Sequence, residues 1–142
     1  MGVDDETVWT LLKRPAVEVP PETTLREVAE ILAGEPIGAV LVRGPRPAGA
    51  PGSRPEGIVS ERDIVRALAE GLDPDDTRAE DVMTLDLASV APGDTIRVAA
   101  QAMLANEVRH VPVTQDGVVI GVVSERDALR AAVADLDGRR PG

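Results

Sequence analysis

The sequence contains one segment twice, and this repeat restricts the chain to folds built from two similar halves. Residues 57–68 read GIVSERDIVRAL and residues 121–132 read GVVSERDALRAA, with Ser-Glu-Arg-Asp unchanged. Upstream, the matching residues lie 71 positions apart: Val19 and Val90, Pro21 and Pro92, Thr24 and Thr95, Arg26 and Arg97, Val40 and Val111, Val42 and Val113. Such self-similarity predicts one supersecondary unit that is present in two copies and buries its apolar face against its neighbour.

The two copies differ by one insertion. The offset falls from 71 residues upstream to 64 at the Ser-Glu-Arg-Asp segments, so the first copy carries seven additional residues. They fall in RGPRPAGAPGSRPE, residues 43–56, which is rich in Gly and Pro and poor in apolar side chains. This composition predicts a solvent-exposed loop between two strands, and a functional lid is the alternative.

Both copies follow the same plan of expected elements. An extended piece leads through a proline to a residue that can cap a helix, Thr23 or Asp94, and apolar residues at helical spacing follow. Two strands and a second helix come next, and Asp116-Gly117 predicts a hairpin turn with positive φ. The expected extended pieces are 17–19 and 89–91, and the expected strands are 37–42, 57–59, 108–113 and 118–123. The order β-α-β-β-α, present twice, predicts an α/β fold in which the paired halves close the core.

The stretch between the copies, GLDPDDTRAEDVMT, has Asp73 before Pro74. This pair is typical of a helix start, so a short connecting helix is predicted. The expected organisation is a first repeat at residues 11–69, a connecting segment at 70–81 and a second repeat at 82–134.

The composition argues against several classes of function. A formal net charge of -10 disfavours nucleic acid as a partner, and Trp9 as the only aromatic residue leaves nothing for bases to stack on. The sequence has no apolar run near the roughly 18 residues of a membrane span, and the acidic start MGVDDETVW is unlike a signal peptide. We therefore expect a cytoplasmic protein that binds neither nucleic acid nor membrane.

Three chemistries are disfavoured by single residue types. With no cysteine and with His110 as the only histidine, one chain does not supply the usual ligands of a zinc site. A Walker-type phosphate-binding loop needs Gly-Lys-Ser/Thr, and it is disfavoured because Lys13, the only lysine, does not lie in such a segment. A hydrolase triad of Ser60 or Ser124 with His110 is disfavoured because neither serine lies in a Gly-x-Ser-x-Gly elbow. No catalytic residue and no metal ligand is predicted.

Several motifs are similar to those of the tandem CBS-domain pair, or Bateman module, named after cystathionine β-synthase. They are the two G-[IV]-V-S-E-R-D segments, DVMT (81–84), VAPGDT (90–95) and VRHVPV (108–113), and the similarity covers about residues 11–133. The stretch GLDPDD also resembles small stand-alone bacterial CBS proteins. The resemblance implies two β-α-β-β-α repeats packed as one pseudo-twofold module. It further implies a regulatory, non-catalytic protein that needs no cofactor and binds an adenosine-containing ligand of the AMP, ADP, ATP, NAD or S-adenosylmethionine type between the repeats.

The repeated Ser-x-x-Asp segments have a chemistry that suits such a ligand. A strand that ends at Ser60 or Ser124 and turns into a helix presents backbone N–H groups and the positive end of the helix dipole to an anion. Asp63 and Asp127 are acceptors suited to ribose hydroxyls. Alternatively, Ser-x-x-Asp is a capping box, which explains both copies without a ligand. Carboxylates held entirely by their own chain would contradict the ligand interpretation.

The copies differ where phosphate selectivity is expected. Arg109 and His110 begin a strand of the second copy, where the first has Gly38 and Ala39. By resemblance, basic residues here contact phosphates, so one phosphate-competent cleft and one weaker or nucleoside-only cleft are expected. Alternatively, both are surface residues paired with neighbouring carboxylates. Candidate adenine contacts are Val17, Val19, Ile37, Leu87 and Val108.

Two further expectations concern packing and partners. Gly57 and Gly121 precede the last residues of a strand, which predicts a bulge or close packing there. The helices IVRALAEGL and ALRAAVADL carry more apolar surface than one small sheet covers, which, with the resemblance, predicts a homodimer. A regulated protein is a further possible partner. The alternative function is an interaction or scaffold module with no physiological nucleotide.

Overall fold

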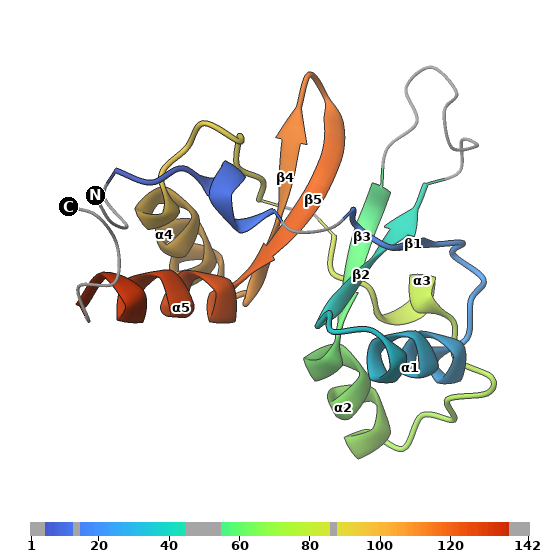
Figure 1. Cartoon of the computed structure of the whole chain (residues 1–142). Coiled ribbons are helices and arrows are strands. Elements are labelled where there is room, and N and C mark those ends of the chain that lie inside the picture. Colours follow the sequence, from blue (N-terminus) through green and yellow to red (C-terminus); the bar gives the residue numbers. More distant parts are fainter. Residues whose placement is uncertain (1–4, 13–14, 45–54, 86–87, 137–142) are drawn as a thin grey trace. The chain divides into compact units, whose positions relative to one another are not determined.

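A computed structural model describes residues 5–12, 15–44, 55–85 and 88–136 of the chain (Figure 1). The chain divides into two compact units. We call residues 16–87 the N-repeat unit, and residues 1–15 together with 88–142 the C-repeat unit. Each unit has helices, strands and its own aliphatic core, which confirms the α/β fold with two repeats.

The N-repeat unit follows the predicted order of strand, helix, two strands and helix. Its elements are β1 (Glu18–Val19), α1 (Leu25–Gly34), β2 (Ala39–Arg43), β3 (Pro55–Ser60), α2 (Glu61–Ala69) and α3 (Ala79–Val82). β2 is the central strand, parallel to β1 and antiparallel to β3. Helices α1 and α2 lie beside each other next to this sheet (Figure 1). Val28 of α1, Val40 of β2 and Val59 of β3 are fully buried in the core of this unit, and valine is favoured at the two strand positions.

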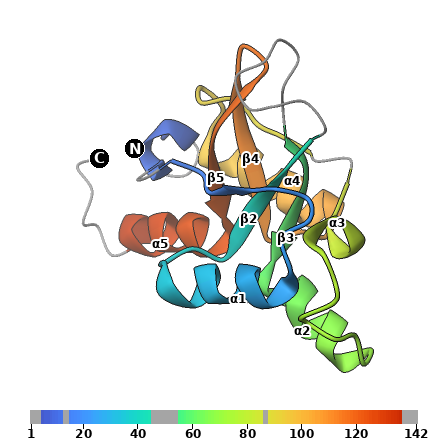
Figure 2. The same ribbon diagram turned by 90° about the vertical axis from the view of Figure 1, so that its right-hand side faces the viewer.

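The C-repeat unit contains a 3-10 helix η1 (Val8–Leu11), α4 (Ile96–Asn106), β4 (His110–Gln115), β5 (Val118–Ser124) and α5 (Glu125–Leu136). β4 and β5 form an antiparallel hairpin, whose turn lies at the end away from α5 (Figure 2). The turn residues Asp116 and Gly117 have φ values of 52° and 78°, as predicted for an Asp-Gly turn. A single parallel bridge between Val90 and Val113 stands where β1 stands in the other unit.

The predicted helix caps are wrong by one residue in both copies. The observed caps are Thr24 and Thr95, not Thr23 and Asp94. The hydroxyl of Thr24 accepts a hydrogen bond from the backbone N–H of Glu27 (3.2 Å), which is the standard N-cap contact. Asp94 instead accepts from the backbone N–H of Ala91 (2.8 Å) and so closes the turn before the helix.

The connecting helix also begins later than predicted. Asp73 closes a turn, because its carboxylate accepts from the N–H of Asp75 (2.9 Å) and its carbonyl from the N–H of Thr77 (2.9 Å). The helical part, α3, begins only at Ala79. The side chain of an aspartate before proline serves a turn as well as a helix, and here the turn is formed.

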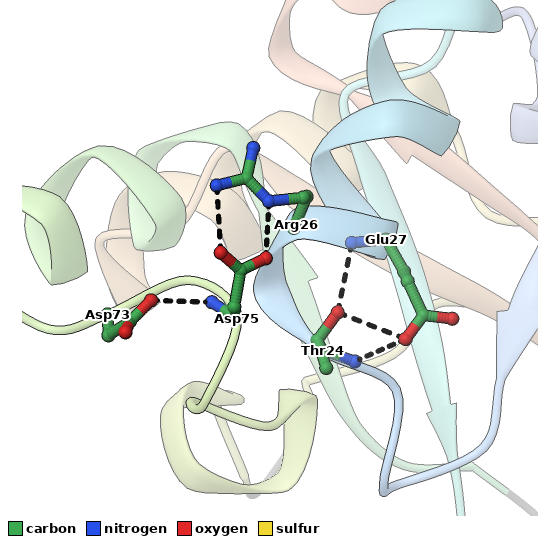
Figure 3. A network of polar contacts seen from close by, with 5 residues as sticks. All are labelled: Thr24, Arg26, Glu27, Asp73 and Asp75. Carbon is green, nitrogen blue, oxygen red and sulfur yellow. Dashed lines mark hydrogen bonds and ion pairs between the residues drawn. The ribbon is translucent and has the colours of Figure 1, made fainter.

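The turn at residues 73–77 is bound to the start of α1 (Figure 3). Arg26 donates two hydrogen bonds to the carboxylate of Asp75, the one from Nη2 at 3.0 Å. This contact raises the pKa of Arg26 and lowers the pKa of Asp75, first through the hydrogen bond. Since both side chains are more than half exposed, the pair itself contributes little to stability. The backbone N–H of Leu25 donates to the carbonyl of Thr77 (2.9 Å), which anchors the turn independently.

Each unit is completed by the segment that leads into the other repeat. We call residues 5–12 and 78–84 the leader segments. Val8 is fully buried in the core of the C-repeat unit, and its N–H donates to the carbonyl of Asp94 (2.8 Å). Ala79 is fully buried in the N-repeat unit, and its N–H donates to the carbonyl of Thr23 (2.7 Å). Val8 and Ala79 lie 71 positions apart, so they are equivalent positions of the repeat.

Both leader segments contact a glycine of the receiving strand. A Cβ atom on Gly57 would lie 2.7 Å from Met83 Sδ and 2.8 Å from the carbonyl oxygen of Thr84. A Cβ atom on Gly121 would lie 2.6 Å from Leu12 Cδ2. The close packing predicted for both glycines is confirmed, and the group that approaches is in each case a leader segment.

Candidate functional site

The junction of β3 and α2 is closed by a complete capping box. The hydroxyl of Ser60 accepts from the backbone N–H of Asp63 (3.3 Å). The Asp63 carboxylate accepts from the backbone N–H of Ser60 (2.8 Å) and from its hydroxyl (3.0 Å). The backbone N–H of Glu61 donates to the carbonyl of Gly38 at the start of β2 (3.0 Å). The capping role predicted for Ser60 and Asp63 is confirmed.

The junction of β5 and α5 repeats these backbone contacts. The hydroxyl of Ser124 accepts from the N–H of Asp127 (3.1 Å), and the Asp127 carboxylate accepts from the N–H of Ser124 (3.0 Å). The N–H of Glu125 donates to the carbonyl of Arg109 (2.8 Å). The two serines differ in one contact. The Ser60 hydroxyl donates a hydrogen bond to the Asp63 carboxylate, whereas the Ser124 hydroxyl donates none to any residue in the described ranges.

These caps reduce the number of amides that are free to bind an anion. The first amide of each helix is bound to a strand carbonyl and the third to a serine hydroxyl. Within the part of the chain that the structure describes, this leaves the second amide, of Arg62 or Arg126, without an acceptor. The prediction of several free N–H groups is therefore wrong, because the caps that create the helix start also occupy its donors. One amide and the helix dipole remain at each junction.

The carboxylates of Asp63 and Asp127 are each bound to their own chain through one oxygen, Oδ2. The other oxygen, Oδ1, accepts no hydrogen bond from any described residue. Both side chains are half-buried. Capping thus accounts for Oδ2 of each carboxylate, and a ligand role for Oδ1 stays a prediction.

The structure brings Arg109, His110 and Ser124 together at one end of the β4–β5 hairpin. His110 is half-buried and lies directly opposite Ser124 in the strand register. Arg109 is exposed, and its Nε lies 3.7 Å from Oε2 of Glu125. This contact is of the kind that the surface-residue alternative predicts for Arg109. Glu125 was missed by sequence reasoning, although the unchanged Glu of both Ser-Glu-Arg-Asp segments was a signal for it.

The equivalent end of the N-repeat sheet carries no basic strand residue. Ala39 lies opposite Ser60 in the register, and Gly38 precedes it. Ala39 is buried, and Gly38 contributes only its carbonyl, to the N–H of Glu61. The difference in charge expected between the two copies is therefore present at structurally equivalent positions.

Most candidate adenine contacts lie against the cores. Val19 is buried in the N-repeat core, and Val17 and Ile37 pack partly buried against it. Val108 packs in the same way in the C-repeat unit, while Leu87 lies outside the described residues. Their packing explains these residues without a ligand.

The C-repeat unit has an apolar groove between α4 and α5 with a volume of about 350 Å³. Its lining includes Ile96, Met103, Val108, Ala128 and Ala132. Glu125 also contributes to the lining, so the groove lies next to the Arg109–Glu125 pair. Its apolar lining suits another apolar surface better than a phosphate or sugar.

The described residues form neither a metal site nor a membrane-spanning helix. No group of three or more His, Asp or Glu side chains there is placed to hold a metal ion. None of the helices in the described ranges combines the length and apolarity needed to cross a membrane.

Comparison with known proteins shows which family has this arrangement of repeats. The model of the CBS domain matches residues 8–70 and 79–134. The chain belongs to the CBS-domain family. The tandem pair recognised from the sequence motifs is thereby confirmed, with one CBS match for each copy.

Solved CBS structures are similar over nearly the whole chain. A CBS domain protein from Pyrobaculum aerophilum, complexed with AMP, is 36% identical, and the match covers 93% of this chain and 98% of that chain with a TM-score of 0.78. A CBS-domain protein from Agrobacterium tumefaciens is 29% identical, with 89% and 93% covered and a TM-score of 0.78.

Two curated relatives are longer than this chain. An uncharacterized protein of Methanopyrus kandleri is 27% identical over 126 residues, which are 87% of this chain and 61% of the relative. A protein of Methanocaldococcus jannaschii is 28% identical over 130 residues, 87% of this chain and 45% of the relative. The chain thus spans about half the length of these relatives.

Proposed function

We propose that this CBS pair is a non-catalytic regulatory module that binds an adenosine-containing nucleotide and signals through dimer or partner contacts. The observation that carries the proposal is the similarity to the Pyrobaculum aerophilum protein that was solved with AMP, at 36% identity over 98% of that protein. The ligand is of the AMP, ADP, ATP, NAD or S-adenosylmethionine type, and no other cofactor is part of the proposal. Repeat boundaries at 11–69 and 82–134 and a cytoplasmic location belong to the same proposal.

The described contacts leave specific groups for such a ligand. In the C-repeat unit, Oδ1 of Asp127 is a free acceptor for a ribose hydroxyl, and the Ser124 hydroxyl is a free donor. Arg109 directly precedes the adjacent strand β4 and His110 begins it, and the two supply the basic groups for a phosphate. Binding signals to a partner only if the ligand prefers one arrangement of the protein over another.

The N-repeat unit offers less to a phosphate. The Ser60 hydroxyl already donates its hydrogen bond to Asp63, and Gly38 and Ala39 carry no charge. Asp63 Oδ1 remains as an acceptor for a sugar hydroxyl. We therefore assign nucleotide phosphate to the C-repeat unit, and at most a nucleoside to the N-repeat unit.

The second candidate is an interaction or scaffold module without a physiological nucleotide. It is favoured by the capping boxes, which account for the repeated Ser60, Asp63, Ser124 and Asp127 by contacts within this chain. The Arg109–Glu125 contact points the same way, since it gives the arginine a partner without any phosphate. The two candidates differ in what they predict for Asp127.

Replacing Asp127 by asparagine is expected to weaken AMP binding. Asparagine keeps an oxygen for the cap but loses the charge, and hydrogen bonds to charged groups contribute about 1.5–3 kcal/mol, or roughly 10- to 140-fold in affinity. The measurement is isothermal titration calorimetry with AMP, ADP, ATP, NAD and S-adenosylmethionine. Asp94→Asn is the matched control, because Asp94 lies in the same unit and also accepts a backbone hydrogen bond at 2.8 Å.

The outcomes separate the two candidates. Equal AMP affinity in the wild type and Asp127→Asn, with a lowered melting temperature in the variant, would support a cap alone. No heat with any of the five ligands at millimolar concentration would refute the nucleotide proposal. A loss of affinity in Asp94→Asn as large as in Asp127→Asn would show that the effect comes from a weakened fold.

Self-association of the chain is part of the proposal. Helix α5 exposes Leu129, Val133 and Leu136, and Val65 on α2 occupies the position equivalent to Leu129. With the adjacent groove between α4 and α5, the three α5 side chains form the kind of apolar patch that pairs with a second copy. Sedimentation velocity at micromolar concentration is expected to show a dimer, which Leu129→Glu weakens and Arg130→Glu, a neighbouring exposed change, does not. A monomer at all concentrations would contradict this expectation.

A further inference from the structure

We propose that Glu125 limits the negative charge that the C-repeat unit accepts, by holding Arg109 in competition with the phosphate of a ligand. This inference rests on the proposed function, because it concerns the same binding residues. It adds a specificity-determining residue that acts through Arg109.

The first step is the geometry of the pair. The backbone hydrogen bond from Glu125 N–H to the Arg109 carbonyl (2.8 Å) fixes the two residues next to each other at the start of α5. Their side chains follow, with Arg109 Nε 3.7 Å from Glu125 Oε2. The carboxylate thus lies beside one nitrogen of the guanidinium, which is also the group that a phosphate needs.

The second step is the exposure of the pair. The side chains of Arg109 and Glu125 are 65% and 54% exposed. Exposed ion pairs are weak, so a phosphate displaces Glu125 at a small cost and is not excluded. The displaced carboxylate remains close by and repels each further negative charge, so the penalty grows from AMP to ATP.

The third step is the comparison with the other copy. Glu61 makes the same backbone contact, to the carbonyl of Gly38 (3.0 Å), but glycine has no side chain to pair with. Arg62 and Arg126 follow the glutamates and are exposed in both units, so they do not distinguish the copies. Glu61 is therefore a matched residue with the same charge and backbone but without a strand arginine.

Replacing Glu125 by glutamine is expected to tighten AMP binding about two- to five-fold, the range that corresponds to an exposed ion pair. Adenosine, which has no phosphate, is expected to bind Glu125→Gln and the wild type equally. The gain for ATP is expected to exceed the gain for AMP, and both gains are expected to shrink as ionic strength rises. In the background of Arg109→Gln, the change at Glu125 is expected to have a smaller effect, because the arginine is no longer there to be released.

The experiment is calorimetric titration of the full chain with adenosine, AMP and ATP, at low and at raised salt, with melting temperatures as a check on folding. The variants are Glu125→Gln, Arg109→Gln, their double mutant and the control Glu61→Gln, which is expected to bind AMP with nearly wild-type affinity. Unchanged or weaker AMP binding in Glu125→Gln, with intact binding by the wild type, overturns the inference and leaves the proposed function standing. An equal gain in Glu61→Gln also overturns it, because the effect is then one of general charge. Absence of AMP binding to the wild type overturns the inference, and absence of binding of all five ligands, AMP, ADP, ATP, NAD and S-adenosylmethionine, overturns the proposed function as well.

Discussion

Replacing Val8 by aspartate is expected to destabilise the C-repeat unit by roughly 3–5 kcal/mol, since a charge without a partner is then buried. Val8 is fully buried and belongs to the same core cluster as Ile96, Val111 and Val123, although it lies more than eighty residues before them in the chain. Its backbone N–H is bonded to the carbonyl of Asp94 (2.8 Å), so the segment has no freedom to turn the new side chain outwards without losing this contact.

The matched control is Thr10→Asp, which adds the same charge to the same leader segment at an exposed position. Urea denaturation followed by circular dichroism gives the loss of stability. Trp9, the only aromatic residue of the chain, reports directly on this segment through its fluorescence anisotropy, which is expected to fall in Val8→Asp and not in Thr10→Asp. Equal stabilities of the two variants would show that the leader segment contributes nothing to the C-repeat core.

The second large effect is expected at Gly57. Gly57→Ala places a Cβ atom 2.8 Å from the carbonyl oxygen of Thr84, and this oxygen accepts a hydrogen bond from the N–H of Ile58 (3.1 Å). A backbone oxygen held in a bridge between two segments does not move aside cheaply. The cost is expected to be about 2–3 kcal/mol, at the upper end of the range for overpacking.

Gly121→Ala is the internal control for Gly57→Ala, because both glycines have the same place in the repeat. Its Cβ atom would meet only side-chain atoms of Leu12, the nearest being the terminal Cδ2 at 2.6 Å. A rotamer change of leucine relieves this contact, so a cost below about 1 kcal/mol is expected. Thermal or urea denaturation measures both, and a larger loss in Gly121→Ala would contradict this account of the two sites.

The sequence was sufficient to predict the repeated α/β plan. Identical Ser-Glu-Arg-Asp segments, helical spacing and the Asp116-Gly117 turn are local signals, and each predicted its element correctly. The helix caps were wrong by one position because Thr23 and Thr24 are both able to cap, and the choice depends on which hydroxyl reaches the N–H of Glu27. The connecting turn was mistaken for a helix start because an aspartate before a proline serves both.

The candidate site was predictable in its residues and less so in its contacts. The sequence identified Ser124, Asp127, Arg109 and His110, which the structure places at one end of the C-repeat hairpin. It did not indicate that the first backbone N–H groups of α2 and α5 donate to the carbonyls of Gly38 and Arg109, since those contacts join residues that are far apart in the chain. For the same reason, the position of Glu125 beside Arg109 was not visible in a one-dimensional pattern.

The leader segments also bear on how such a chain can be shortened or duplicated. A fragment that contains only the second repeat would lack Val8 and Leu11, and its core would have a cavity in their place. A fragment that contains only the first repeat would lack Ala79, and have the corresponding cavity, only if the chain were cut before α3. An ancestor with a single repeat would therefore have had to pack its leader segment on its own repeat or exchange it with a second molecule. Gene duplication would have made this exchange intramolecular. Each repeat then depends on the leader segment of the other to complete its core.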